Sequence, residues 1–295
     1  MEKLANNYFE FLLNKKRASA NTISSYKRDI VNYIKYLKDN NFDGINANST
    51  MVLNYLLDIQ KAGKSPATAS RALASIRSFY QYLMQNKKVA SDPTYKMHSF
   101  NSERKLPRGL SEIQINLLLD TPVCRNVKGF RDKAMLETMY ATGMSVSDII
   151  NIRLTDINLK IGYINCRHEG KERVIPIYTL ARDSIKDYLE KRDAIPNSDK
   201  TDFLFLNLSG EPLSRQGLWK ILKTYLKKAQ LPTDITPHSL RHSFALHLLE
   251  NGADLKSVKD MLGHVNITST QVYEKQLKDK MTQVYFNAHP GSKRK

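Results

Sequence analysis

Residues 236–273 read TPHSLRHSFALHLLENGADLKSVKDMLGHVNITSTQVY, and this stretch begins with a strong helix start. Thr236 can cap the first turn with its hydroxyl, and Pro237 fits the first helical position, where no backbone donor is lost. Apolar residues recur after them at helical spacing, and the helix should end near Asn251 and Gly252. The sequence therefore predicts a helix of about four turns here.

His238 and Arg241 stand three residues apart near the start of this helix, so they share one of its faces. A helix N-terminus already favours anions through its free N–H groups and its dipole. An imidazole and a guanidinium beside it add further hydrogen-bond donors. The pair predicts a phosphate site.

Two shorter helices are expected next. The first covers 255–262 and is stopped by Gly263, which leaves His264 in the following turn. A hydroxyl at 268–269 can cap the second, which presents Tyr273. Taken singly, such an arginine and histidine pair is more often a surface or capping pair, a histidine after a glycine is often a cap, and a tyrosine on such a helix is usually core. Their order within one stretch is what indicates a functional site.

The composition is strongly basic. The 295 residues hold 46 Lys and Arg against 29 Asp and Glu, for a formal net charge of +17 and a pI near 9.7. This excess indicates a polyanionic partner, and the lack of an apolar run of spanning length favours nucleic acid over a membrane. Cys124 and Cys166 are too few for a disulfide framework, and the N-terminus lacks a signal peptide's apolar segment. We expect a cytoplasmic protein.

The first hundred residues predict four amphipathic helices and no strand, which together make a compact bundle. Its second and fourth helices carry hydroxyl and basic side chains, among them Thr22, Arg28, Arg71 and Arg77. Most such faces are simply solvated. Hydroxyls and arginines along a helix also contact DNA phosphates and base edges, and we predict DNA contact by these four residues.

Residues 96–109 (KMHSFNSERKLPRG) lose the apolar periodicity and have the composition of a linker. A domain boundary is therefore expected near 103–107, with an N-terminal DNA-binding domain over 1–103 and a second domain over 107–295. Two domains joined by a basic linker could close around a duplex as a clamp.

The second domain mixes helices with short β-like runs around 153–157, 162–166 and 173–177, and the last two predict a hairpin with its tip at Gly170. A helix over 214–230 has an apolar face and a basic face that includes Arg215, for which DNA contact is predicted. Near the start of the domain, Ser111 should cap a helix with Ile113, Leu117 and Leu118 facing inward. The fold class expected for the whole chain is mainly α with a small β-sheet.

Several phrases of the sequence resemble the tyrosine recombinase (phage integrase) family, and most closely its short bacterial Xer branch. They are T-P-H-S-L-R-H-S-F-A, then L-G-H and T-x-x-Y, together with N-T-I-S-S-Y-K-R-D-I and S-R-A-L-A-S-I-R-S-F-Y-Q-Y-L in the N-terminal half. The resemblance covers nearly the whole chain. It implies an N-terminal SAM-like core-binding domain and a catalytic domain whose terminal helix docks on a neighbouring protomer.

The resemblance also implies a reaction and partners. Such an enzyme cleaves and rejoins DNA through a 3′-phosphotyrosyl intermediate and a Holliday junction, with no metal or nucleotide cofactor. It acts at inverted-repeat sites in double-stranded DNA, as a homo-tetramer or as a hetero-tetramer with a paralogous recombinase, in some cases activated by a DNA translocase. The expected location is the bacterial nucleoid, and the expected task is chromosome dimer resolution or the integration and excision of a mobile element.

By motif, Tyr273 corresponds to the nucleophile, and Arg241, His238 and His264 correspond to the residues that hold the scissile phosphate. A phenol has an ordinary pKa of about 10, so cations must help it lose its proton. The phosphorane-like state gathers negative charge, which arginines and histidines stabilise. A further lysine or histidine can protonate the departing 5′ oxygen.

Two positions depart from the family pattern. In A-T-G-M-S-V-S-D-I-I, Ser145 stands where the family has an arginine, while Asp148 keeps the expected acidic type. In the hairpin, the family pattern G-K-G-x-K-E-R places the catalytic lysine at His168, so either His168 or Lys171 is the expected general acid. These changes leave open an alternative, a weakened relative that binds DNA as an architectural or regulatory protein.

Overall fold

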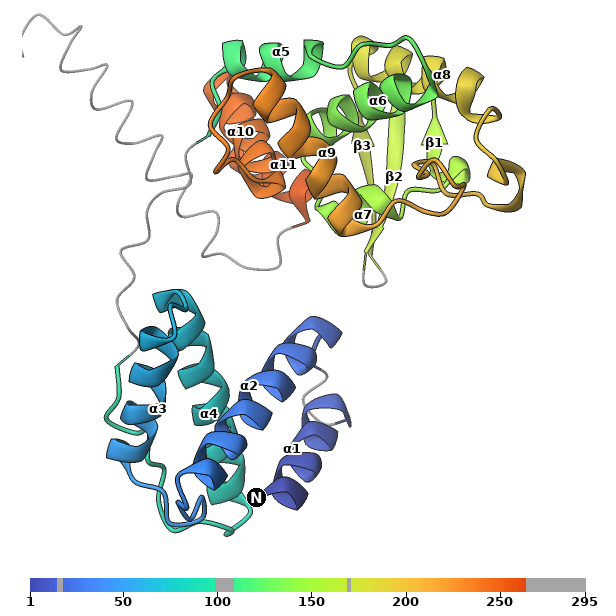
Figure 1. The fold of residues 1–295 in the computed structure, drawn as a ribbon. Coiled ribbons are helices and arrows are strands. Elements are labelled where there is room, and N and C mark those ends of the chain that lie inside the picture. Colours follow the sequence, from blue (N-terminus) through green and yellow to red (C-terminus); the bar gives the residue numbers. More distant parts are fainter. Residues whose placement is uncertain (15–17, 99–108, 169–170, 264–295) are drawn as a thin grey trace, which may run out of the picture. The chain divides into compact units, whose positions relative to one another are not determined.

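The structure is a computed structural model, and it describes residues 1–14, 18–98, 109–168 and 171–263. The chain divides into two compact units, Met1–Lys105 and Leu106–Lys295 (Figure 1). Both units are dominated by helices, and the second also holds a small sheet. The predicted fold class, mainly α with a small β-sheet, is confirmed.

Unit 1 is a bundle of helices, and all but the first start where the sequence supplies a cap. The helices are α1 (Glu2–Asn14), α2 (Ala20–Asp39), α3 (Ser49–Lys61) and α4 (Pro66–Gln85). Ser19, Asn48 and Ser65 precede the last three helices, and each side chain accepts a hydrogen bond from a backbone N–H of the first turn. In the described part of unit 1, no strand interrupts this bundle.

Aromatic side chains fill the core of unit 1. Tyr8, Tyr33, Phe79 and Tyr80 are fully buried. The hydroxyls of Tyr33 and Tyr80 lie 3.2 Å apart, and that of Tyr80 donates to the Gly44 carbonyl at 2.8 Å. These bonds satisfy phenol groups that would otherwise be costly to bury.

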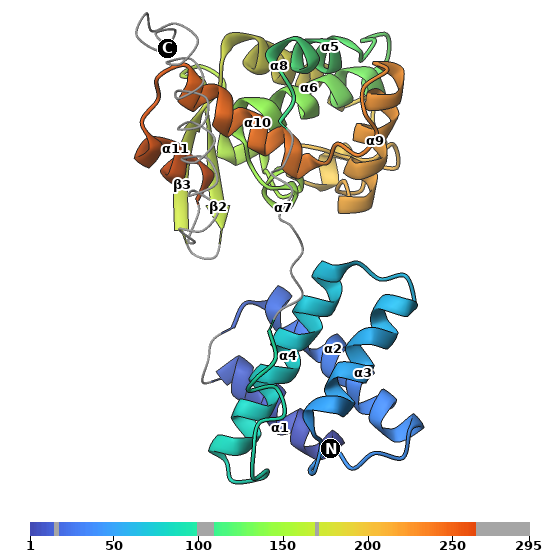
Figure 2. The same cartoon turned by 90° about the vertical axis from the view of Figure 1, so that its left-hand side faces the viewer.

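Unit 2 surrounds one central helix. Its elements are α5 (Glu112–Asp120), α6 (Val127–Thr142), α7 (Val146–Ile150), β1 (Ile157–Asn158), β2 (Tyr163–His168), β3 (Lys171–Pro176), α8 (Thr179–Arg192), α9 (Arg215–Lys228), α10 (Pro237–Glu250) and α11 (Leu255–Leu262). Helix α6 packs along α8 and against α10 (Figures 1 and 2). Most of its residues are buried, including Arg131, Asp132 and Glu137. Because α6 is covered on several sides, it holds the neighbouring elements in place.

The sheet is antiparallel in the order β1-β2-β3, and the predicted hairpin is formed by β2 and β3. Its predicted tip at Gly170 lies outside the described residues. The run at 153–157 was expected to be a strand, and this is wrong for most of it. Residues Leu154–Asp156 form a 3₁₀ turn instead, because the Asp156 carboxylate accepts the backbone N–H of Arg153 at 2.9 Å.

The inward face predicted for α5 is also partly wrong. Leu118 is buried, but Ile113 and Leu117 are 80% and 49% exposed. Ile115 and Leu119 take the inward positions. A nine-residue helix with apolar residues on most of its circumference has no single apolar stripe, so only packing decides which face is covered.

Within the described ranges, every helix is too short or too polar to cross a membrane.

Candidate active site

Helix α10 carries two of the predicted site residues, and its start is built as the sequence predicts. Thr236 accepts the backbone N–H of Ser239 at 3.1 Å, and the Ser239 hydroxyl accepts that of Thr236 at 3.1 Å in return. This cap fixes the first turn, from which His238 and Arg241 project. His238 is exposed and Arg241 is partly buried.

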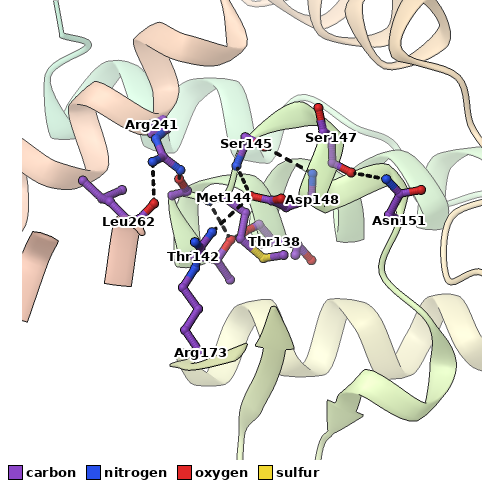
Figure 3. Close-up of polar contacts among 11 residues, drawn as sticks. Thr138, Thr142, Met144, Ser145, Ser147, Asp148, Asn151, Arg173, Arg241 and Leu262 are labelled. Carbon is purple, nitrogen blue, oxygen red and sulfur yellow. Dashed lines mark hydrogen bonds and ion pairs between the residues drawn. The ribbon is translucent and has the colours of Figure 1, made fainter. Parts of the chain in front are cut away.

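Arg241 ties α10 to two other parts of unit 2. Its Nη1 donates to the Gly143 carbonyl, and its Nη2 donates to the Leu262 carbonyl, each at 2.6 Å (Figure 3). Gly143 ends α6 and Gly263, which follows Leu262, ends α11, both in the left-handed region at φ 57° and 65°. Both carbonyls therefore belong to helix ends, where acceptors lack partners within the helix. The guanidinium is held rigidly at the meeting point of three helices.

The pKa of His238 is lowered from its ordinary value of 6.5. Desolvation by the surrounding protein atoms disfavours the charged form, and the Arg241 guanidinium adds positive charge nearby. The imidazole is therefore mainly neutral at pH 7. It can donate one hydrogen bond to an anion without first losing a proton.

We expect His238 of the free protein to titrate below pH 6.5. The unfolded chain binds this proton with the ordinary pKa, so the folded state loses stability as the pH falls below 6.5 and loses none above it. Histidine NMR titration of the full chain, with the His238 signal assigned from His238→Gln, checks this. Arg241→Gln should move the pKa back toward its ordinary value. A His238 signal that titrates with a pKa of 6.5 or above would contradict the predicted lowering of this pKa.

Ser145 begins α7 as its N-cap. Its hydroxyl accepts the backbone N–H of Asp148 at 3.2 Å, and Oδ2 of Asp148 accepts the backbone N–H of Ser145 at 3.2 Å. The same carboxylate oxygen accepts a charged hydrogen bond from Nη2 of Arg173 at 3.0 Å. Figure 3 shows Arg173 reaching from the sheet to this turn. Ser145 thus forms a local cap and leaves only its hydroxyl proton for another partner.

Arg173 lies on β3 directly opposite Cys166 of β2. Directly paired residues point to the same face of a sheet, and Cys166 is buried, so Arg173 projects toward the interior of unit 2. Burial raises the pKa of the Cys166 thiol to about 11, so this thiol is not a nucleophile near pH 7. Sequence reasoning treated Arg173 only as part of the K-E-R phrase. Its place two residues after Lys171 on a predicted strand was the available signal.

The other predicted site residues are only partly described. His168 and Lys171 are paired in register at the end of the β2–β3 ladder, which brings the two candidate acids to one place on the backbone. His264 and Tyr273 lie outside the described residues. The structure therefore brings Arg241, His238 and Ser145 into one region of unit 2, and it sets Arg173 beside them.

Of the predicted DNA contacts in unit 1, Arg28 is exposed on α2, and Thr22 bonds within the first turn of that helix through Ser19. Arg71 forms an ion pair with the buried Asp29 at 2.9 Å. Arg77 donates to the carbonyls of Thr94 and Met97, so it holds the segment after α4. In unit 2, Arg215 is exposed at the start of α9. DNA contact by these five residues stays a prediction.

Comparison with known proteins finds relatives over nearly the whole chain. Residues 108–280 match the phage integrase family, and residues 5–87 match the phage integrase N-terminal SAM-like domain. A putative tyrosine recombinase of Caldanaerobacter subterraneus subsp. tengcongensis is 42% identical over 289 residues, which are 98% of this chain and 99% of that protein. Tyrosine recombinase XerD of Halalkalibacterium halodurans is 41% identical over 297 residues, again 98% and 99% of the two chains.

Solved structures share the fold. The XerH recombinase in its post-cleavage complex with a palindromic difH substrate has a TM-score of 0.77 at 20% identity, covering 96% of this chain and 84% of that one. A lambda integrase dimer bound to a core site has a TM-score of 0.68 at 17% identity, covering 92% and 94%. The chain belongs to the phage integrase family as a Xer-type tyrosine recombinase, a site-specific DNA recombinase. Relatives that are themselves recombinases do not favour the alternative of a DNA-binding protein without catalysis.

Proposed function

We propose that this recombinase cleaves and rejoins DNA strands through a 3′-phosphotyrosyl intermediate formed by Tyr273. The Tyr273 phenol gives up its proton to solvent, and its oxygen attacks the scissile phosphorus to form a new O–P bond. The bond from phosphorus to the 5′ oxygen breaks, and this oxygen leaves with a proton from a general acid. Attack by a 5′ hydroxyl reverses these steps and restores tyrosine. The phosphodiester energy is kept in the ester, so rejoining needs no nucleotide.

The observation that carries the proposal is the anchored guanidinium of Arg241 beside a neutral His238. Two carbonyl contacts at 2.6 Å hold that guanidinium before any substrate arrives, so no reorganisation is needed when charge develops on the phosphate. His238, and His264 by its place in the motif, add hydrogen bonds to the non-bridging oxygens. Ser145 offers neither charge nor a bidentate fork, so turnover is weaker than with an arginine there.

A nicked suicide duplex tests this function, because the short strand released by cleavage diffuses away and the covalent product accumulates. DNA fragments bound by the protein in pooled genomic DNA supply the site. We expect a protein–DNA adduct on a denaturing gel, and its absence with Tyr273→Phe. If Tyr273→Phe forms as much adduct as the wild type, the nucleophile is a different residue. Specific DNA binding by the wild type without any adduct would favour a non-catalytic role.

We propose further that the general acid lies at the hairpin end where His168 and Lys171 are paired in register. His168→Ala and Lys171→Ala should be compared on a normal phosphate and on one whose 5′ bridging oxygen is replaced by sulfur. A thiolate leaves without a proton, so the variant that removes the acid should be slow only on the normal phosphate. If neither variant slows normal cleavage, both assignments are wrong.

We propose that residues 1–103 and 107–295 act as separate DNA-binding and catalytic domains. Recombination of paired inverted-repeat sites would then require four protomers and pass through a Holliday junction. This assembly is the one that the resemblance to Xer recombinases implies, and a paralogous recombinase or a DNA translocase are the further partners that we propose with it. Mass measurement of the protein on two synthetic sites distinguishes a tetramer from a dimer on each.

A further inference from the structure

The position expected to hold an arginine is occupied by Ser145, yet a guanidinium still reaches the same turn. Arg173 comes from β3, and its Nη2 lies 3.0 Å from Oδ2 of Asp148, the oxygen that also accepts the Ser145 backbone N–H. Asp148 is 5% and Arg173 17% exposed in their side chains. Arg173 therefore lies beside Ser145 in a partly enclosed place, and part of its side chain remains exposed.

The donors of Arg173 are only partly used. Its Nε is buried and makes no hydrogen bond within the described part of the chain. A buried N–H without an acceptor is unfavourable, and this one belongs to a charged group. An anion that reaches this guanidinium would supply the missing acceptor.

The backbone makes room for Arg173 at the end of α11. A Cβ placed on Gly263 would lie 1.7 Å from Nη1 of Arg173, so only glycine allows the guanidinium to sit there. Leu262, the residue before it, accepts the hydrogen bond from Arg241. The guanidiniums of Arg173 and Arg241 therefore meet the same two-residue corner, Leu262 and Gly263.

Two guanidiniums meet this corner. Nη2 of Arg173 pairs with the Asp148 carboxylate, while Arg241 donates to the neutral carbonyls of Gly143 and Leu262. Positive charge gathered in a partly buried place favours an anion. A phosphodiester is the anion that this enzyme class brings to Arg241.

We propose that Arg173 takes over the role of the arginine missing at position 145 and contacts a non-bridging oxygen of the scissile phosphate. This inference rests on the proposed function. Arg173 then forms, with Arg241, a pair of guanidiniums that stabilises the charge of the phosphorane-like state. Asp148 orients Arg173 and keeps its charge in place when DNA is absent.

The test uses the full chain on the nicked duplex, with Arg173→Gln, Ser145→Arg and the double variant. A second duplex carries a methyl group in place of one non-bridging oxygen, which makes the scissile phosphate neutral. We expect Arg173→Gln to slow adduct formation by ~10²–10³-fold on the normal phosphate and much less on the neutral one. Ser145→Arg should restore most of the lost rate in the double variant. Arg153→Gln, which removes another guanidinium that is paired with a carboxylate, should change neither substrate's rate.

Each outcome decides between a phosphate contact and a purely structural role. If Arg173→Gln slows both substrates equally, or if Ser145→Arg restores nothing, Arg173 only holds the turn and the inference fails. Thermal unfolding and DNA binding of each variant identify a folding defect. Arg173→Lys keeps the charge and part of the contact, so its rate of adduct formation should lie between those of wild type and Arg173→Gln. If the wild type itself forms no adduct, the proposed function fails together with the inference.

Discussion

Replacing Arg241 with alanine is expected to slow formation of the Tyr273 adduct by about 10²–10³-fold or more. The guanidinium is anchored by the carbonyls of Gly143 and Leu262, so it is already in place to stabilise charge on the phosphate. Removing it loses that charge and leaves both carbonyls without this donor. Arg241→Lys should recover little, because an ammonium cannot span two acceptors with a planar fork. Single-turnover cleavage of the nicked duplex measures the effect.

Arg182→Gln is the matched control for Arg241. Arg182 is a partly exposed arginine of the same unit, 3.1 Å from Asp183, and its loss should leave the cleavage rate unchanged. The DNA affinity of Arg241→Ala should fall far less than its cleavage rate, because the contact between Arg241 and the phosphate strengthens as negative charge develops in the transition state. A cleavage rate for Arg241→Ala close to that of the control would show that this guanidinium does not act on the phosphate.

Replacing Asp132 with alanine is expected to lower the stability of unit 2 by ~3–5 kcal/mol. Oδ1 of Asp132 accepts bonds from Nε and Nη2 of Arg131 at 2.9 and 2.6 Å, and Oδ2 accepts the Tyr225 hydroxyl at 2.9 Å. The two charged side chains are 4% and 1% exposed. Without the carboxylate, the Arg131 charge stays buried and unpaired, which is costly because water cannot reach it.

Thermal unfolding of the full chain measures this loss, which corresponds to ~6–20 °C for a unit of this size. Asp202→Ala is the control, because it breaks an ion pair of similar length with Arg153 that is 47% and 46% exposed. An exposed pair contributes ~1 kcal/mol or less. Equal falls in the unfolding temperature of the two variants would contradict the claim that burial makes the Asp132 network more stabilising than the exposed pair.

Capping signals in the sequence were reliable guides to the helices. Ser65 with Pro66, and Thr236 with Pro237, begin α4 and α10 where predicted, and α11 covers the predicted 255–262. These signals are reliable because a cap and its partner lie three residues apart, so neighbouring residues decide the geometry. The inward face of α5 was predicted wrongly, since its apolar residues do not form one stripe.

The family, the helices, the hairpin and the candidate roles of Arg241 and His238 followed from the sequence, because motifs and capping boxes depend on residues close together along the chain. Only the tertiary structure decided which groups meet around Ser145. Arg241 contacts a carbonyl 98 residues away, and Arg173 reaches a carboxylate 25 residues away. Such contacts depend on how α6, α10, α11 and the hairpin pack, and the spacing of residues along a chain carries no record of that packing. The second guanidinium beside the candidate phosphate site therefore became visible only in the folded molecule.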